Sequence, residues 1–266
     1  MIWIEIYNVL KVWERRNNMK VLAIESSSIT ASVAIVTDDV LTAEYTINHK
    51  KTHSQTLLPM IAQICEMTET EMKSLDLIAI SNGPGSFTGL RIGCATGKGL
   101  GLALDIPVVS VPTLEAMAYN MYGHDKIICP IMDAKRANVY TGIYTWSDKI
   151  DMKIHILLNQ CILPIEAVID KLNELDKEVV FIGDGIPVSR STIESNMNVK
   201  YSFAPAHLSS QRAASVAVLG KVLYEEGKSM NAREILPEYL RPTQAERELD
   251  KKMSIENNKM KCNKII

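Results

Sequence analysis

Short apolar runs bounded by turn residues divide the first half of the chain into predicted strands and helices. Runs of strand length predict buried strands, and apolar residues recurring with helical spacing predict helices. Turn residues at positions 26–30 and 38–39 separate the first three strands. The predicted strands cover residues 21–24, 32–36, 41–47, 77–80 and 108–111, and the predicted helices cover residues 55–67 and 90–104.

The second half of the chain repeats this order. A strand, a polar turn and a second strand are followed by a helix, a further strand and a last helix. A strand hairpin followed by helices therefore occurs twice, with a linker around residues 119–126. We expect strands at residues 127–132, 139–146 and 179–182, and helices near residues 164–175 and 210–226.

Residues 81–118 form the most unusual segment, because seven of the chain's 13 glycines lie between Gly83 and Gly101. The segment leads from a predicted strand into a predicted helix. Backbone N–H groups converge where such a helix begins, and this arrangement can hold an anion. The candidate anion-site residues are Gly83, Gly85, Ser86, Thr88, Gly89 and Arg91.

Glycines recur every four residues along this helix and line one of its sides. Glycine inside a helix costs about 0.5–1 kcal/mol relative to alanine, so we expect another backbone to pack closely against this side. Two interpretations stay open: packing within the chain, or contact with a helix of another subunit. The residues are Gly89, Gly93, Gly97 and Gly101.

Several motifs together resemble one protein family. Residues 83–93 read GPGSFTGLRIG, and TLEA follows at residues 113–116. Further motifs are KVLAIESSS at 20–28, HSQTLLPMI at 53–61, DAKRANVY at 133–140, FIGDG at 181–185 and PEYLR at 237–241. They resemble the motifs of the TsaB (YeaZ) family, whose members take part in the bacterial synthesis of threonylcarbamoyladenosine on tRNA. The resemblance runs from residue 19 to residue 246.

The resemblance implies an α/β fold, namely the duplicated actin-like (ribonuclease H-like) fold, in which two subdomains have central mixed sheets flanked by helices. It places the N-terminal subdomain at residues 19–122 and the C-terminal subdomain at residues 123–246. Residues 1–18 precede the resemblance, and our hypothesis is that Met19 is the true start and that a misassigned reading frame adds the extension. Residues 247–266 are polar and rich in lysine, so we expect a disordered basic tail.

Composition limits the classes of function. The chain is 47% hydrophobic and 23% charged, which is typical of a globular protein, and its net charge is −2. Strong tRNA binding needs a basic face, so we expect tRNA contact only through a complex. The five cysteines are scattered without a Cys-x-x-Cys pair, which indicates buried thiols in a reducing cytoplasm. We expect a cytoplasmic protein that does not enter a membrane.

The sequence offers two places for a metal, and favours neither. His49 and His53 have the i, i+4 spacing of helical ligands, but they lie where a strand ends and a helix begins, so His53 is more typical of polar surface or a partner contact. The related TsaD transferases carry a metal-binding histidine pair in the region that resembles Thr113 and Met117 here. Neither side chain replaces an imidazole, so the resemblance implies no resident metal and no transfer reaction by this chain alone.

Acidic and hydroxyl residues in two predicted hairpin loops, and an aspartate in a later turn, are candidates for a nucleotide site. By resemblance to actin-like kinases, the positions are Glu25, Ser26, Asp133 and Asp184. Serine and aspartate also cap and turn the backbone for local reasons. We favour this second interpretation, a vestigial site. We expect no firmly bound cofactor, and ATP or ADP at a partner interface stays open.

An apolar stripe along the helix at residues 55–67 is a candidate for partner binding. Leu57, Ile61 and Cys65 share one helix face. Such a stripe usually marks core. The resemblance implies instead that this helix and the glycine-lined helix form an interface, in a homodimer or with a TsaD-like subunit. The predicted interface residues are Leu57, Ile61, Cys65, Gly93, Gly97 and Gly101.

The sequence thus predicts a non-catalytic subunit. By resemblance, it activates a metal-bearing TsaD-like transferase, together with a TsaE-like ATPase, in threonylcarbamoyl transfer to adenosine 37 of ANN-decoding tRNAs. A small-molecule kinase or ATPase of the actin-like superfamily is the leading alternative, with Glu25 and Asp133 as its acidic groups. A metallopeptidase is the weaker alternative, because it needs a metal that the sequence does not supply.

Overall fold

A mixed sheet forms the centre of the first half of the chain in the computed structural model, which describes residues 18–147 and 153–241. Its central strand, β1 (Lys20–Glu25), pairs antiparallel with β2 (Thr30–Thr37) and parallel with β4 (Leu77–Gly83). Outside these lie β3 (Val40–Asn48) on one edge, and β5 (Val108–Pro112) and the short β11 (Ser229–Met230) on the other.

A second mixed sheet repeats this arrangement. Its central strand, β6 (Ile127–Asp133), pairs antiparallel with β7 (Asn138–Trp146) and parallel with β9 (Val179–Ile182). The edges are β8 (Ile154–Pro164) and β10 (Tyr201–Phe203). The order β8-β7-β6-β9-β10 matches β3-β2-β1-β4-β5 strand for strand, and this is the duplication that the sequence predicts.

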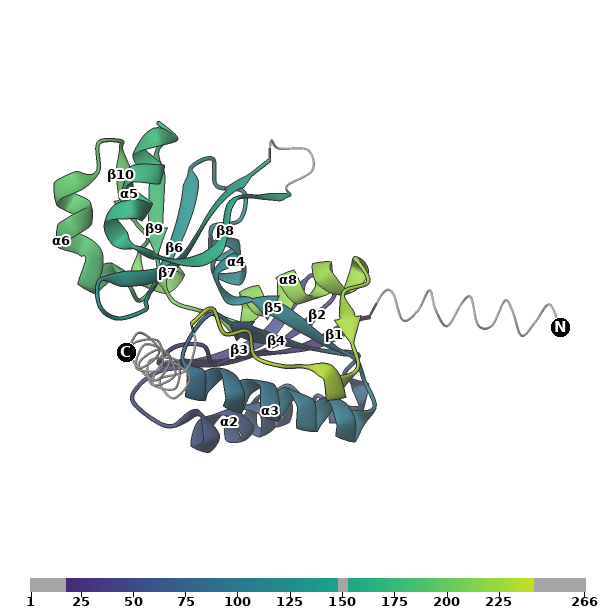
Figure 1. The fold of residues 1–266 in the computed structure, drawn as a ribbon. Coiled ribbons are helices and arrows are strands. Elements are labelled where there is room, and N and C mark those ends of the chain that lie inside the picture. Colours follow the sequence, from purple (N-terminus) through teal and green to yellow (C-terminus); the bar gives the residue numbers. More distant parts are fainter. Residues whose placement is uncertain (1–17, 148–152, 242–266) are drawn as a thin grey trace, which may run out of the picture.

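Alternating side chains of β1 face two different layers of helices. Leu22 and Ile24 pack toward α2 (His53–Met67) and α3 (Phe87–Leu104) on the outer face. Val21 and Ala23 point to the opposite face, which α8 (Ala213–Glu225) covers. Figure 1 shows α2 and α3 below the first sheet and α8 above it. Both faces of the central strands β1, β2 and β4 are therefore buried, which explains their nearly continuous apolar runs.

The second sheet is covered in the same way. Its outer face packs on α5 (Ile165–Glu174) and α6 (Ile186–Asn196). Its inner face packs on α4 (Thr113–Ala118) and the helical turn η2 (Tyr119–Met121), near α7 (Ala206–Ser209). Helix α4 also contacts α8 and β4, so it joins the two halves. Short 3-10 turns lie at η1 (Met72–Ser74) and η3 (Ala232–Glu234).

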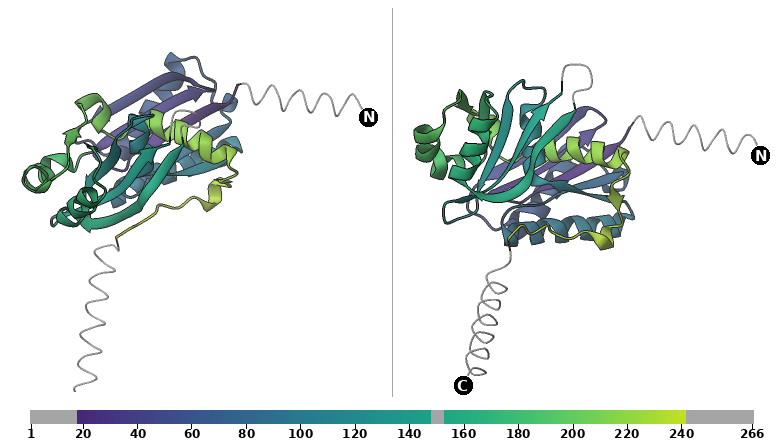
Figure 2. Two further views of the ribbon diagram at one scale, coloured as in Figure 1. Left: turned by 90° about the horizontal axis from the view of Figure 1, so that it is seen from above. Right: turned by 45° about the horizontal axis from the view of Figure 1, so that its top comes forward.

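Helix α8 lies on the first sheet, although its sequence position groups it with the second half. It contacts β1, β2, β4 and β5, and the segment after it adds β11 to the edge of the first sheet. A Cβ on Gly220 would lie 2.5 Å from Cβ of Ala79, so glycine lets α8 approach β4 closely. The views in Figure 2 show α8 over the first sheet. The first sheet is therefore covered and extended by α8 and β11, which lie within the range 123–246 that the sequence prediction gave to the C-terminal subdomain.

Some of the sequence predictions cannot be compared with the structure, and two of its elements were not predicted. The expectations for residues 1–17 and 247–266 lie outside the described residues. Strand β8 and helix α6 have no counterpart among the predicted elements, whereas the other long elements match to within a few residues. In the part of the chain that the structure describes, no helix combines the length and apolarity needed to cross a membrane.

Candidate functional site

A cleft opens between the two sheets where their parallel strands end. Loops after β1, β4, β6 and β9 meet there, because parallel strands bring their carboxyl ends to the same edge of a sheet, where ligands bind in open α/β folds. The cleft has a volume of about 480 Å³. We call it the inter-sheet cleft, lined by Ser27, Ser28, Ile29, Gly85, Ser86, Met132, Asp133, Ala134, Lys135, Tyr140, Asp184 and Arg241.

Asp133 is held by its neighbour in the β6–β7 turn. The backbone N–H of Lys135 donates to Oδ1 of Asp133 (2.7 Å), and the Lys135 ammonium pairs with Oδ2. Partial burial acts to raise the pKa of Asp133, but the hydrogen bonds and charge of Lys135 outweigh it and hold this pKa below its ordinary value. Asp133 is therefore a paired carboxylate whose charge is already largely balanced.

Asp184 faces the same cleft from the turn after β9. The residue as a whole is exposed, yet desolvation of its carboxyl raises its pKa, and the nearby side-chain amide of Gln211 opposes part of that rise. The charge of Asp133 raises it further. The two carboxyl groups thus influence each other across the cleft, and the structure brings together Asp133 and Asp184 of the four predicted nucleotide-site residues.

Glu25 and Ser26, the other two, lie beneath the cleft rather than in its lining. Glu25 is 1% exposed, and its Oε1 accepts a hydrogen bond from the N–H of Ser27 (2.6 Å). Burial raises the pKa of Glu25, and the interaction with Ser27 offsets part of that rise. The hydroxyl of Ser26 donates to the carbonyl of Gly89 (2.9 Å). Glu25 therefore fixes the first loop internally, and Ser26 holds that loop against α3.

The glycine-rich loop before α3 is occupied by the chain's own backbone. A Cβ on Gly83 would lie 2.3 Å from the carbonyl oxygen of Glu238, and Gly83 has φ +134°. A Cβ on Gly85 would lie 2.2 Å from the carbonyl oxygen of Ser27. Ser86 caps the helix through its side chain, which accepts from the N–H of Gly89. These glycines thus admit neighbouring backbone, while Gly85 and Ser86 also line the cleft.

The remaining candidates of that loop face outward. The guanidinium of Arg91 lies 3.9 Å from the ring centre of Phe87, and its Nε donates to the hydroxyl of Tyr239 (2.9 Å). The Nε donor of Arg91 is therefore engaged by a side chain close to the end of the described residues. Thr88 is exposed in the first turn of α3.

The glycine-lined side of α3 packs within the chain, which decides between the two interpretations of the sequence. A Cβ on Gly89 would lie 2.1 Å from the carbonyl oxygen of Ser26, a backbone atom that cannot move freely. Corresponding distances are 2.2 Å for Gly93 to Ser26 Oγ, 2.2 Å for Gly97 to Ile80 Cδ1, and 2.7 Å for Gly101 to Ala232 Cβ.

The predicted interface residues lie inside the molecule. Leu57, Ile61 and Cys65 are 1%, 2% and 8% exposed and belong to the core beneath α2. Gly93, Gly97 and Gly101 are buried with them. Their side chains are not offered to another protein, because the apolar stripe and the glycine ridge both face the first sheet. The exposed positions of the two helices include Leu58 and Met67 on α2, and Ala95, Gly99, Leu102 and Ala103 on α3.

Of the residues weighed as metal ligands, His49 is exposed, whereas His53, Thr113 and Met117 are committed to the core. His53 is 8% exposed, and its Nε2 lies 2.8 Å from the carbonyl oxygen of Ser28, so the expectation of a surface histidine is corrected. The hydroxyls of Thr113 and Ser81 are 2.8 Å apart. Met117 is 1% exposed. No cluster of three or more metal-ligating side chains occurs among residues 18–147 and 153–241.

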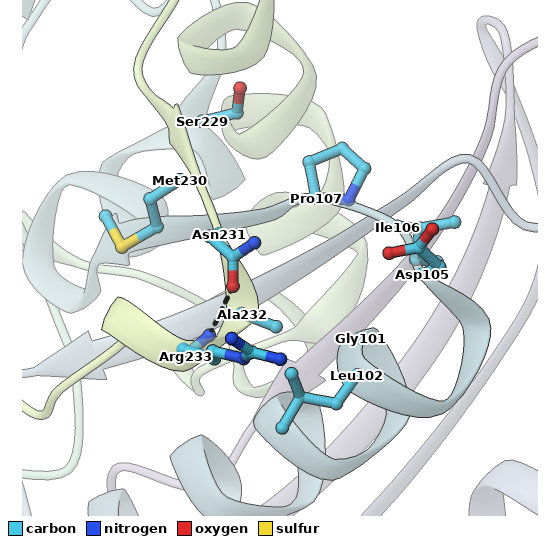
Figure 3. A pocket seen from close by; sticks show the side chains of 10 residues that line it. All are labelled: Gly101, Leu102, Asp105, Ile106, Pro107, Ser229, Met230, Asn231, Ala232 and Arg233. Atoms are coloured by element: carbon cyan, nitrogen blue, oxygen red, sulfur yellow. Dashed lines mark hydrogen bonds between the residues drawn. The ribbon is translucent and has the colours of Figure 1, made fainter.

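A second hollow of about 510 Å³ lies at the opposite end of α3. Figure 3 shows that the end of α3 and the following turn form one wall, and the segment from β11 to η3 forms the other. The Asn231 side chain accepts from the N–H of Arg233 (3.0 Å) and fixes the turn of that segment. Its lining is mixed, with Asp105 and Arg233 as the charged side chains. Sequence reasoning missed this hollow, because its walls lie far apart along the chain.

Comparisons with known proteins agree with the motifs. The family model described as "TsaD: tRNA N6-adenosine threonylcarbamoyltransferase" matches residues 41–249. The tRNA threonylcarbamoyladenosine biosynthesis protein TsaB of Bacillus subtilis (strain 168) is 33% identical over 233 residues, covering 86% of this chain and 96% of that protein. The protein of the same name from Escherichia coli (strain K12) is 31% identical over 170 residues, covering 63% and 72%.

Solved structures agree as well. The structure "YeaZ from Pseudomonas aeruginosa" has a TM-score of 0.71 and 25% identity, and the match covers 84% of this chain and 100% of that one. The duplicated actin-like fold that the sequence predicts is thereby confirmed. With motifs, length and fold in agreement, the chain belongs to the TsaB (YeaZ) family.

Proposed function

We propose that this protein acts in tRNA threonylcarbamoyladenosine biosynthesis as a non-catalytic subunit. The observation that carries the proposal is the match to a TsaB protein over 96% of that protein's length. In this role the chain binds a TsaD-like transferase and activates it, together with a TsaE-like ATPase, for threonylcarbamoyl transfer to adenosine 37 of ANN-decoding tRNAs. Contact with tRNA is made through the complex.

The exposed side of α3 supports a partner surface. A Cβ added at Gly89, Gly93, Gly97 or Gly101 would lie within 3 Å of another part of the chain. A Cβ added at Gly99 would have no atom of the described residues within 4 Å beyond its own helix backbone. Glycine costs about 1 kcal/mol relative to alanine at an exposed helix position, and nothing in the described part of the chain accounts for Gly99. Ala95 and Ala103 lie one turn before and after it, and all three are exposed. A partner helix that approaches the backbone closely would account for this stripe.

Neighbouring apolar side chains enlarge this surface. Leu58 on α2 is 55% exposed, Met67 is 71% exposed, and Leu102 on α3 is 45% exposed. Helices α2 and α3 contact each other, so their outer faces form one continuous layer (Figure 1). We assign the partner contact to this layer, in place of the buried residues that the sequence suggested.

The positions of Thr113 and Met117 support a non-catalytic role. Both side chains are engaged in packing or hydrogen bonding within the chain, at the place where the resemblance puts the metal ligands of the transferase. Replacing either with histidine would need a rearrangement of the core. The transfer step is therefore assigned to the partner subunit.

Reconstitution tests the proposal. Threonylcarbamoyl-adenylate, unmodified tRNA and the ATPase are combined with this chain, with the transferase, or with both, and modified adenosine is measured by mass spectrometry. We expect product only when both proteins are present. Product formed by this chain alone, or a transferase indifferent to it, would refute the proposed role.

A matched pair of variants tests the surface. Leu58→Arg places a charge on the proposed partner layer, whereas Val188→Arg makes the same kind of change at an exposed position of α6 on the other subdomain; Val188 is 63% exposed. We expect Leu58→Arg to weaken binding to the transferase by roughly tenfold or more, and Val188→Arg to leave it unchanged. Calorimetric titration measures both. Equal effects of the two variants would rule out this layer.

A kinase or ATPase is the second candidate function, favoured by one observation. The inter-sheet cleft gathers Asp133, Asp184 and Lys135 around a volume of about 480 Å³, with Ser27 opposite. ATP hydrolysis by the purified chain, abolished by Asp133→Ala, would support this candidate. Absence of hydrolysis together with activation of the transferase would support the non-catalytic role.

Analytical ultracentrifugation of the isolated chain tests the expected homodimer.

A further inference from the structure

The segment at residues 236–241, which we call the C-terminal strap, crosses from the first subdomain to the second. It leaves the first core at Ile235, which is 2% exposed. In Figure 1 the corresponding yellow segment runs back along α3 toward the second sheet. Its end, Arg241, lines that cleft.

The strap is fastened to the first subdomain at two points. The N–H of Glu238 donates to the carbonyl oxygen of Asn82 at the end of β4 (2.7 Å). The ring of Tyr239 stacks on Phe87 with centroids 4.5 Å apart, and its hydroxyl accepts from Nε of Arg91. The missing side chain of Gly83 makes room for the carbonyl of Glu238.

The same strap is fastened to the second subdomain at two other points. The carboxylate of Glu238 accepts a hydrogen bond from Nε2 of Gln160 on β8 (3.1 Å). The guanidinium of Arg241 donates to the carbonyl oxygen of Ala134 in the β6–β7 turn. One short segment thus joins the loop of one sheet to the edge strand and hairpin turn of the other.

Little apolar area holds the strap in place. None of residues 236–241 is buried; Leu236 is 71% exposed and Tyr239 is 37% exposed. A segment held by a few solvent-accessible hydrogen bonds and one ring stack opens locally at low cost, without unfolding the core on which it lies. The strap can therefore detach beyond Ile235 while the first core stays intact.

We propose that residues 236–241 form a releasable clasp that fixes the angle between the two sheets and closes one side of the inter-sheet cleft. Release of the strap frees β8 and the β6–β7 turn from the loop before α3. The cleft then opens, and the half-buried carboxyl group of Asp133 becomes more accessible. The motif GPGSFTGLR thus forms the surface on which the motif PEYLR binds within the same chain. The proposal does not depend on the function proposed above.

Hydrogen–deuterium exchange of the full-length protein tests the clasp. For each variant, the exchange rate is measured in the subdomain whose contact with the strap was not mutated. Tyr239→Ala loosens the first-subdomain end, and exchange is read at residues 133–138. Arg241→Ala loosens the second-subdomain end, and exchange is read at residues 82–86. Each variant removes one or two hydrogen bonds or a ring stack, so local opening becomes easier. The amide exchange rate at the distant site should therefore rise by about three- to tenfold in both variants. Leu236→Ala, an exposed change within the same segment, should leave both unchanged.

Two further results decide the outcome. Tyr239→Phe keeps the ring stack and loses only the hydroxyl, so it should produce a smaller change of the same kind. Circular dichroism must show that each variant keeps its folded content, which the surface position of the strap predicts. Faster exchange confined to the altered end, or no change at either distant site, would overturn the proposal, because a clasp fails as a whole when either end is released.

Discussion

Two alanine substitutions in α3 should change stability in opposite directions. Gly89→Ala introduces a Cβ 2.1 Å from the carbonyl oxygen of Ser26. This oxygen belongs to the backbone, so it cannot move aside as a flexible side chain would. Gly99→Ala introduces a Cβ that has, apart from its own helix backbone, no atom of residues 18–147 and 153–241 within 4 Å. The helix, the residue type and the added methyl group are the same, so the difference isolates packing against the first loop.

The magnitudes follow from these surroundings. Overpacking a tightly fitted site costs about 1–3 kcal/mol, so Gly89→Ala should lower the free energy of unfolding by that amount, less any gain in helix propensity. Gly99→Ala should raise it by about 0.8–1 kcal/mol, because alanine is the better helix former at an exposed position. For a chain of this size each kcal/mol moves the midpoint of thermal unfolding by about 2–4 °C.

Urea denaturation followed by circular dichroism measures both free energies, and differential scanning fluorimetry provides the midpoints. Wild type and the two variants are compared at one protein concentration, since self-association through α3 would add to apparent stability. The reasoning fails if the two variants shift in the same direction, or if Gly89→Ala is neutral. In either case the contact of α3 with the first loop would be looser than the structure has it.

Two further predictions concern buried titratable groups. Burial raises the folded-state pKa of Glu25 above its ordinary value, so the stability linked to its bound proton is present at low pH and lost as pH rises through the folded pKa. Glu25→Gln should therefore gain stability relative to wild type as pH rises, which urea titrations at several pH values would test; a constant difference would contradict it. Burial also raises the pKa of the Cys129 thiol to about 12, whereas Cys161 is only partly buried, with a smaller rise. Alkylation followed by peptide mass spectrometry should modify Cys161 first, and equal rates would contradict the described burial.

The fold was largely predictable because its two halves carry the same pattern. The strands predicted at residues 21–24 and 127–132 are the centres of β1 (Lys20–Glu25) and β6 (Ile127–Asp133), since strands buried on both faces produce continuous apolar runs. Strand β8 escaped prediction because it is an edge strand whose residues are mostly exposed or half-buried, so its pattern lacks a clear apolar side. Apolar periodicity also shows that α8 has a buried face, but not which sheet receives it.

The candidate site was predicted less completely, and for a related reason. Asp133 and Asp184 lie at the carboxyl ends of strands in one sheet, so topology alone brings them together. Glu25 also ends a strand, yet its carboxyl turns under the loop to accept from Ser27. Which way a side chain turns at a strand end depends on local hydrogen bonds, and residue spacing does not contain that information.

The glycine-rich segment shows how far a motif can be read without a structure. Spacing of four residues correctly indicates that something packs closely on one side of α3. It does not identify what packs there, since a loop, a strand and a second subunit all leave the same pattern. In the structure the first loop, β4 and η3 pack against the glycine-lined side of α3. The carbonyl oxygen of Glu238 in the strap packs against Gly83. Gly99 is the glycine of α3 that meets no other part of the described chain, so a substitution there tests the partner surface without disturbing the core.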